Sequence, residues 1–144
     1  GIVVPANINA PNQVVISGET ESVKLAIKDA KLMGLRRVIP LNVSGAFHSP
    51  LMESARFDLA DAIAITEFKR TKCPIYQNVD AKGNTDVLVI KSNLEAQLTS
   101  PVKWTQCVKQ MINDGATSFY ESGPGSVLQG LIRKVNSEMQ VNDY

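Results

Sequence analysis

Strand-type and helix-type segments alternate along most of this chain, and the alternation constrains the fold more than any other feature. Patterns of buried strands occur at 37–43, 74–79 and 118–121, and helical patterns occur at 51–65, 87–98, 103–114 and from Pro124 to about Val135. Strands that alternate with helices are typical of a parallel sheet layered with helices. The sequence therefore predicts an α/β fold.

The first third of the chain is organised differently. Two extended segments, 2–7 and 13–17, flank an Asn- and Pro-containing turn, and a helical face follows over Glu19–Met33. With the strand at 37–43, the order β-β-α-β is most of a ferredoxin-like unit without its first strand and helix. The chain begins at Gly1 rather than at Met, so we expect a segment to precede it. We expect the last six residues to be frayed.

Composition excludes several classes of protein. A net charge of +1 gives no overall field for nucleic acid or an anionic membrane. Cys73 and Cys107 are far apart, with no second Cys or His near either, which excludes zinc and redox motifs. We expect both to be buried free thiols of a cytoplasmic protein. No stretch reaches the roughly 20 apolar residues that a membrane span requires.

His48, the sole histidine, follows the predicted strand at 37–43 in a loop rich in Gly, Ser and Pro. The carboxyl ends of strands in an open α/β sheet are where ligands bind. An imidazole pKa of about 6.5 suits proton transfer near neutral pH. His48 is therefore the candidate general base, and a structural histidine is the open alternative.

The remaining motifs have structural interpretations. The run from Glu121 to Ser126 resembles an anion-binding helix start, but Leu128 stands where a dinucleotide motif needs its third glycine. No G-x-S-x-G nucleophile motif occurs. Trp104 lies on the apolar face of a helix and is expected in the core. The residues thus indicate a base without a nucleophile, metal or cofactor loop.

Five segments, taken together, resemble the malonyl-CoA:acyl-carrier-protein transacylase family. They are spread in register over the chain: VPANINAPNQVVISG (4–18), GAFHS (45–49), YQNVD (76–80), QLTSPVKW (97–104) and YESGPGSVL (120–128). No single segment is decisive, but five in the same order are specific.

The resemblance implies an architecture for the chain. Family members join a large α/β-hydrolase-like domain to an inserted ferredoxin-like domain. Residues 1–43 would be part of the small ferredoxin-like subdomain, and residues 44–144 would be the C-terminal part of the large acyltransferase subdomain. The G-H-S-x-G segment with the nucleophilic serine would lie earlier in the protein. We therefore expect the 144 residues alone to be inactive. We also expect that they do not fold stably alone.

The resemblance also implies a reaction and its residues. A serine attacks the malonyl thioester, coenzyme A leaves, and the phosphopantetheine thiol of the carrier protein takes the acyl group. His48 would be the general base and acid, and the backbone carbonyl of Gln97 would orient it. Phe47 would select malonyl over methylmalonyl groups, and Asn9 would line the cleft between the domains. The chain has Gly45 where related polyketide acyltransferases often have His.

The implied partners are malonyl-CoA and the acidic acyl carrier protein, and the implied state is a monomer. No cofactor is implied beyond these substrates. Because basic surfaces bind acidic partners, Arg133 and Lys134 are the favoured docking residues, with Arg36 and Arg37 as the alternative. An acyltransferase domain of a polyketide or fatty acid synthase would share these motifs. A non-catalytic carrier-protein-binding module is the alternative of a different class.

Overall fold

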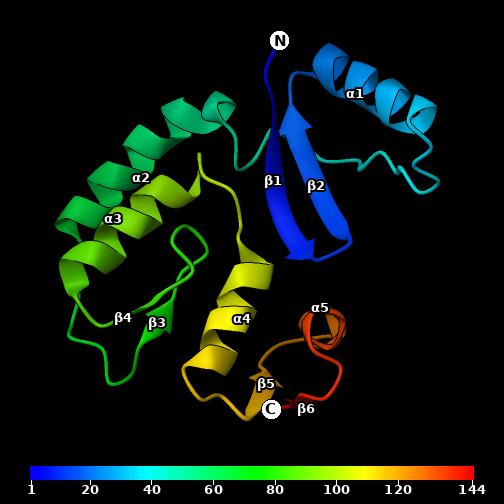
Figure 1. The fold of residues 1–144 in the computed structure, drawn as a ribbon. Helices are drawn as coiled ribbons and strands as arrows, with labels where there is room; N and C mark the ends of the chain where they lie inside the picture. The colour runs from blue at the N-terminus through cyan, green and yellow to red at the C-terminus, as the bar shows by residue number, and fades with distance from the viewer.

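The computed structural model describes residues 1–144 as a mixed α/β structure with three separate two-stranded sheets (Figure 1). Its elements follow in this order: β1 (Val3–Ala10), β2 (Gln13–Gly18), α1 (Thr20–Leu32), η1 (Pro50–Met52), α2 (Glu53–Ile65), β3 (Ile75–Tyr76), β4 (Gly83–Asn84), α3 (Val87–Gln97), α4 (Trp104–Asn113), β5 (Ser118–Glu121), α5 (Val127–Val135) and β6 (Gln140–Asp143).

The first two strands form an antiparallel hairpin. Ala10 pairs with Gln13 across the tight turn Pro11–Asn12, and the register is irregular at Ala6 and Asn9. Strand β1 is also tied to the start of α4, because the Ile8 amide donates to the Val102 carbonyl over 2.8 Å and the Val102 amide donates to the Ala6 carbonyl over 2.8 Å. The hairpin is therefore fixed to the segment that leads into α4.

The predicted strand at 37–43 is wrong. Residues 33–47 run without regular structure from α1 to η1. Ile39, Leu41 and Val43 are all more than half exposed. A strand exists through hydrogen bonds to a neighbouring strand, and this segment pairs with none. The observed order is thus β-β-α, and the division of the chain at residue 43 stays a prediction.

The core lies between α4, α5 and the β5–β6 pair. Val108, Ile132 and Val141 form its buried cluster, and Trp104 and Phe119 pack against it. The prediction that Trp104 belongs to the core is confirmed. The short parallel sheet β5–β6, connected through α5, is the one β-α-β unit in the chain.

Two predictions near the C-terminus are wrong. The last residues are not frayed, because β6 pairs with β5 and Val141 is buried. The last helix begins at Val127 rather than at Pro124. Gly123 and Gly125 adopt positive φ values of 136° and 90°, which a right-handed helix cannot contain.

The other helices match the sequence pattern closely, and α2 and α3 lie side by side (Figure 1). The strand expected at 74–79 is shortened to β3, which pairs with β4 in antiparallel orientation. The layered parallel sheet is likewise not observed: β5–β6 alone is a parallel pair, beside one isolated parallel bridge between Asn7 and Val102.

Candidate active site

His48 lies in a strained turn between the irregular segment and η1. Its φ is +59°, in the left-handed region that residues with a Cβ rarely adopt. Its amide donates to the Leu98 carbonyl over 3.1 Å, which ties the turn to the residue after α3. Strained backbone of this kind persists where surrounding contacts determine it, and it is concentrated at functional sites.

The ring of His48 is also bonded to the end of α3. Its Nδ1 lies 2.9 Å from the backbone oxygen of Gln97. A carbonyl oxygen can only accept, so Nδ1 carries the proton and Nε2 keeps its lone pair. The Gln97 side-chain nitrogen is 3.3 Å from the same Nδ1. Since both groups would be donors, the shorter backbone contact is the hydrogen bond. The structure thus brings together the two residues expected to act as a pair.

His48 and Phe47 line a large open hollow of ≈ 1770 Å³. The hollow is also lined by β2, α1 and the irregular segment, through residues such as Ile16, Val23 and Ile39. Phe47 is 45% exposed, and a Cβ on Gly45 would lie 3.3 Å from its ring. The glycine therefore leaves room for this aromatic side chain.

Asn9 does not line this hollow, whereas Asn7 on the same strand does. Asn9 occupies the irregular position of the hairpin between Ile8 and Ala10. The position of Asn9 in a cleft between domains stays a prediction.

The four candidate docking residues are all exposed, but they differ in their contacts. The Arg133 guanidinium donates to the Val141 carbonyl over 3.2 Å, and Lys134 donates to the Gln13 side chain over 2.8 Å. Lys134 and Arg37 both line the hollow, whereas Arg133 and Arg36 do not. Each of the two candidate pairs thus contributes one cation to the lining of the same hollow.

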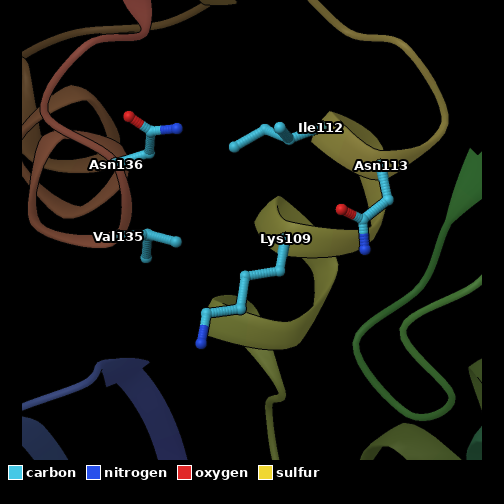
Figure 2. A pocket seen from close by; sticks show the side chains of 5 residues that line it. All are labelled: Lys109, Ile112, Asn113, Val135 and Asn136. Carbon is cyan, nitrogen blue, oxygen red and sulfur yellow. The ribbon is translucent and has the colours of Figure 1, made fainter.

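A second, smaller pocket of ≈ 240 Å³ lies between α4 and α5 (Figure 2). Ile112 and Lys109 on α4 point toward Val135 and Asn136 at the end of α5, and Asn113 completes the lining. The pocket contains none of the predicted site residues.

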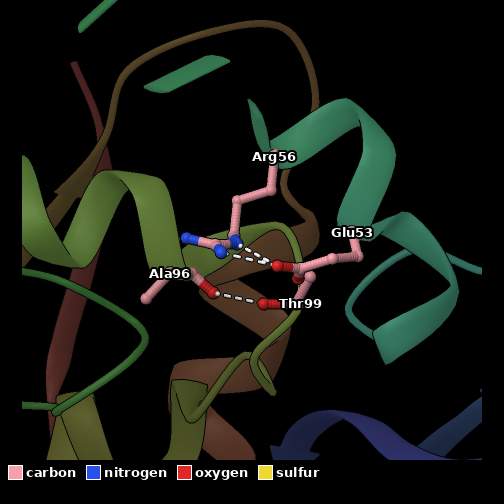
Figure 3. A network of polar contacts seen from close by, with 4 residues as sticks. All are labelled: Glu53, Arg56, Ala96 and Thr99. Atoms are coloured by element: carbon pink, nitrogen blue, oxygen red, sulfur yellow. Dashed lines mark hydrogen bonds and ion pairs between the residues drawn. The ribbon is translucent and has the colours of Figure 1, made fainter. Parts of the chain in front are cut away.

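The beginning of α2 lies next to the end of α3, close to Gln97 (Figure 3). Arg56 donates to the Glu53 carboxylate over 3.0 and 2.5 Å, and the Thr99 hydroxyl donates to the Ala96 carbonyl over 3.5 Å. The hydrogen bond from Arg56 lowers the pKa of Glu53. The pair is partly exposed, so it contributes little to stability.

A polar network missed by sequence reasoning holds α3 in place. Asn93 on α3 donates to Asp80 over 3.0 Å and to Gln77 over 3.2 Å, and Gln77 donates to the Ile90 carbonyl over 3.0 Å. Burial raises the pKa of Asp80, but hydrogen bonds from Asn84, Asn93 and the Lys82 amide outweigh burial and lower it. The polar residues that follow β3 in the sequence could have indicated such a network, but they do not identify Asn93 on α3 as the partner.

The strand–glycine–helix junction is capped by the chain itself. Both oxygens of Glu121 accept backbone hydrogen bonds at the start of α5, from Leu128 and Gln129, each over 3.1 Å. An internal carboxylate thus occupies the position that an anion would take at this helix.

The two cysteines are free, as predicted, but Cys73 is exposed, and only Cys107 is buried. Burial raises the pKa of the Cys107 thiol to about 11. No group of three or more His, Cys, Asp or Glu side chains is arranged to hold a metal ion. No helix is both long and apolar enough to span a membrane.

A histidine oriented by a backbone carbonyl, beside an open hollow on a mixed α/β framework, is an arrangement that a general base requires. The chain belongs to the acyl transferase domain family, whose model matches residues 2–144. The family resemblance drawn from the five segments is thereby confirmed.

Similar proteins carry the same name as that resemblance. The chain is 44% identical over 140 residues to the malonyl CoA-acyl carrier protein transacylase of Staphylococcus aureus (strain COL), covering 97% of this chain and 46% of the relative. The Bacillus subtilis transacylase is 43% identical over 135 residues, covering 94% of this chain and 43% of the relative.

Solved structures agree. An acyl carrier protein S-malonyltransferase from Vibrio cholerae superposes with a TM-score of 0.95 at 40% identity, over 99% of this chain and 46% of that one. A type II polyketide malonyl-transacylase in complex with its acyl-carrier protein superposes with a TM-score of 0.91 at 37% identity, over 99% and 45%. The chain therefore spans about half the length of the proteins it matches.

Proposed function

We propose that these residues form the histidine-bearing part of a malonyl-CoA:acyl-carrier-protein transacylase of fatty acid biosynthesis. The observation that carries the proposal is the 2.9 Å contact between His48 Nδ1 and the Gln97 carbonyl. It fixes one tautomer and one orientation of the ring, which a general base requires. The names of the similar proteins support malonyl as the acyl group.

In the proposed reaction, a serine outside these 144 residues is the nucleophile. His48 Nε2 takes the serine proton as the serine oxygen attacks the malonyl thioester carbonyl. The carbon–sulfur bond breaks, and the imidazolium returns the proton to the coenzyme A sulfur. The carrier-protein thiol then attacks the acyl-serine, with the same proton transfers in reverse order. Protonation of Nε2 leaves the Nδ1–H bond to Gln97 in place, so the cation stays oriented.

Phe47 is the proposed selectivity residue. Its ring lines the hollow next to His48 and packs against Gly45, where any side chain would crowd it. A bulky ring beside the reacting group disfavours substrates with an extra methyl group, an effect of about 1–3 kcal/mol.

Arg133 and Lys134 are the proposed docking residues for the acidic carrier protein, with Arg36 and Arg37 as the alternative. Support comes from their exposure and from Lys134, which lines the same hollow as His48. A rim charge acts mainly on the rate of association, which falls as salt rises.

The test is a comparison of the full-length protein with its His48→Gln variant in malonyl transfer from malonyl-CoA to carrier protein. We expect kcat/KM to fall by about 10²- to 10⁴-fold, the usual contribution of a general acid–base group. Ser92→Ala is the matched control, because Ser92 is exposed on α3. A loss below about tenfold would exclude the assigned role of His48. Robust turnover by the 144 residues alone would show that the nucleophile lies within them.

A further inference from the structure

The side chain of Ser49, next to His48, is completely buried, although its neighbours Phe47 and Leu51 are 45% and 41% exposed. A buried hydroxyl needs hydrogen-bond partners. Ser49 Oγ donates to the Ala46 carbonyl over 2.6 Å and accepts from the Leu51 amide over 3.3 Å. The hydroxyl therefore uses both its donor and an acceptor position within one turn of backbone.

These two hydrogen bonds connect the Ser49 hydroxyl to the backbone on both sides of His48. The accepting carbonyl lies two residues before it and the donating amide three residues after it, so the hydroxyl closes the turn in which His48 has a φ of +59°. Without that closure, a residue with a Cβ favours right-handed or extended backbone. Either change would redirect the Cα–Cβ bond and move the ring away from the Gln97 carbonyl.

We propose that Ser49 is a positioning residue, whose buried hydroxyl holds the backbone of His48 in the conformation that aims Nδ1 at the Gln97 carbonyl. Ser49 is not among the residues that line the hollow. It therefore acts through His48 and not by contact with substrate. The kinetic part of this inference rests on the proposed function, whereas the placement of the ring does not.

The experiment uses the full-length protein labelled with ¹⁵N-histidine, in which the His48 signals are assigned by their loss in His48→Gln. The fraction of neutral His48 with its proton on Nδ1 is measured for wild type, Ser49→Ala and Ser49→Thr. We expect Ser49→Ala to move the proton partly to Nε2, and Ser49→Thr, which keeps the hydroxyl, to resemble wild type. Ser92→Ala, which removes an exposed serine hydroxyl, is the control.

The same variants are then compared in malonyl transfer. We expect Ser49→Ala to lower kcat by roughly 10- to 100-fold, as expected for a misplaced catalytic group. KM for malonyl-CoA should stay within about twofold, because no substrate contact is lost. Wild-type tautomer and wild-type kcat in Ser49→Ala would overturn the proposal.

Ser49→Thr and Ser49→Val form a second pair, which decides the matter if Ser49→Ala does not fold. Both add branching at Cβ, and they differ only in the hydroxyl. Retention of the Nδ1 proton in Ser49→Thr and its loss in Ser49→Val supports the role, and equal behaviour of the two contradicts it. If the protein transfers no malonyl group, the proposed function fails, but the tautomer comparison still decides the role of Ser49.

Discussion

The packed region around α4 and the open region from α1 to residue 47 differ sharply in how their apolar residues are used. Val108 and Cys107 on α4 are almost completely buried. Helix α1 has no buried residue, and the segment after it exposes Ile39, Leu41 and Val43. Burial of apolar surface is the main source of stability. The packed region therefore holds the fold, and the open region forms a wall of the hollow.

His48 lies where these two regions meet. Its ring and its amide are bonded to the end of α3, while Phe47 beside it faces the hollow. The proposed base is thus fixed on one side by the end of α3 and borders the open hollow on the other.

Thiol reactivity should show the largest difference. Cys107 is buried with its pKa raised to about 11, whereas Cys73 is exposed. Since only the thiolate reacts, alkylation at pH 8 should be at least about 100-fold slower at Cys107 than at Cys73. Peptide mass spectrometry over a time course measures both rates, with urea-unfolded protein as the control for equal reactivity. Similar rates in the folded protein would show that α4 is not packed as described.

Truncation of an apolar side chain should lower the free energy of unfolding more in the packed region than in the open region. Ile132 is 4% exposed and Leu32 is 77% exposed. We expect Ile132→Ala to lower the free energy of unfolding by about 2–5 kcal/mol. The matched Leu32→Ala should change it by no more than about 0.5 kcal/mol. Urea denaturation of the full-length protein measures both, and equal losses would contradict the contrast.

Removing the link between α3 and the loop after β3 should have a smaller effect. Asn93→Ala leaves Asp80 and Gln77 each without one hydrogen bond, at a cost of about 1–3 kcal/mol. The adjacent Ser92→Ala is the control, because Ser92 is exposed on the same helix. If both variants unfold at the same urea concentration, the network does not hold α3.

The pH dependence of stability should reflect Asp80. Its pKa is lower in the folded state than its ordinary value, so its contribution is fully present above the unfolded pKa of about 3.9 and is lost as pH falls through the folded pKa. Asp80→Asn should therefore lose less stability than wild type on acidification below about pH 4. Melting temperatures between neutral pH and pH 2 measure this difference. Parallel curves would exclude Asp80 as a contributor.

Local patterns predicted the helices well, and they failed where structure depends on distant partners. Helices α3 and α4 match their predicted spans to about one residue, because the helical period and the capping residues are local signals. The apolar run at 37–43 has the composition of a strand but no strand to pair with. Strand β6 is polar at three of its four positions, so nothing in its sequence distinguishes it from a frayed end.

The residues of the candidate site likewise differ in whether local sequence predicts them. His48 could be predicted because Gly, Ser and Pro mark its loop. Gln97 could be predicted only from the family resemblance, since its contact with His48 joins positions 49 residues apart. The role proposed for Ser49 depends on burial and on a strained turn, neither of which the sequence displays.

The most direct test of the account is the protonation of neutral His48 in the wild-type full-length protein, measured by ¹⁵N NMR above the imidazole pKa. We expect the proton on Nδ1, bonded to the Gln97 carbonyl, and an unprotonated Nε2 that is free to act as a base. A proton found predominantly on Nε2 would contradict the contact that carries the proposed function.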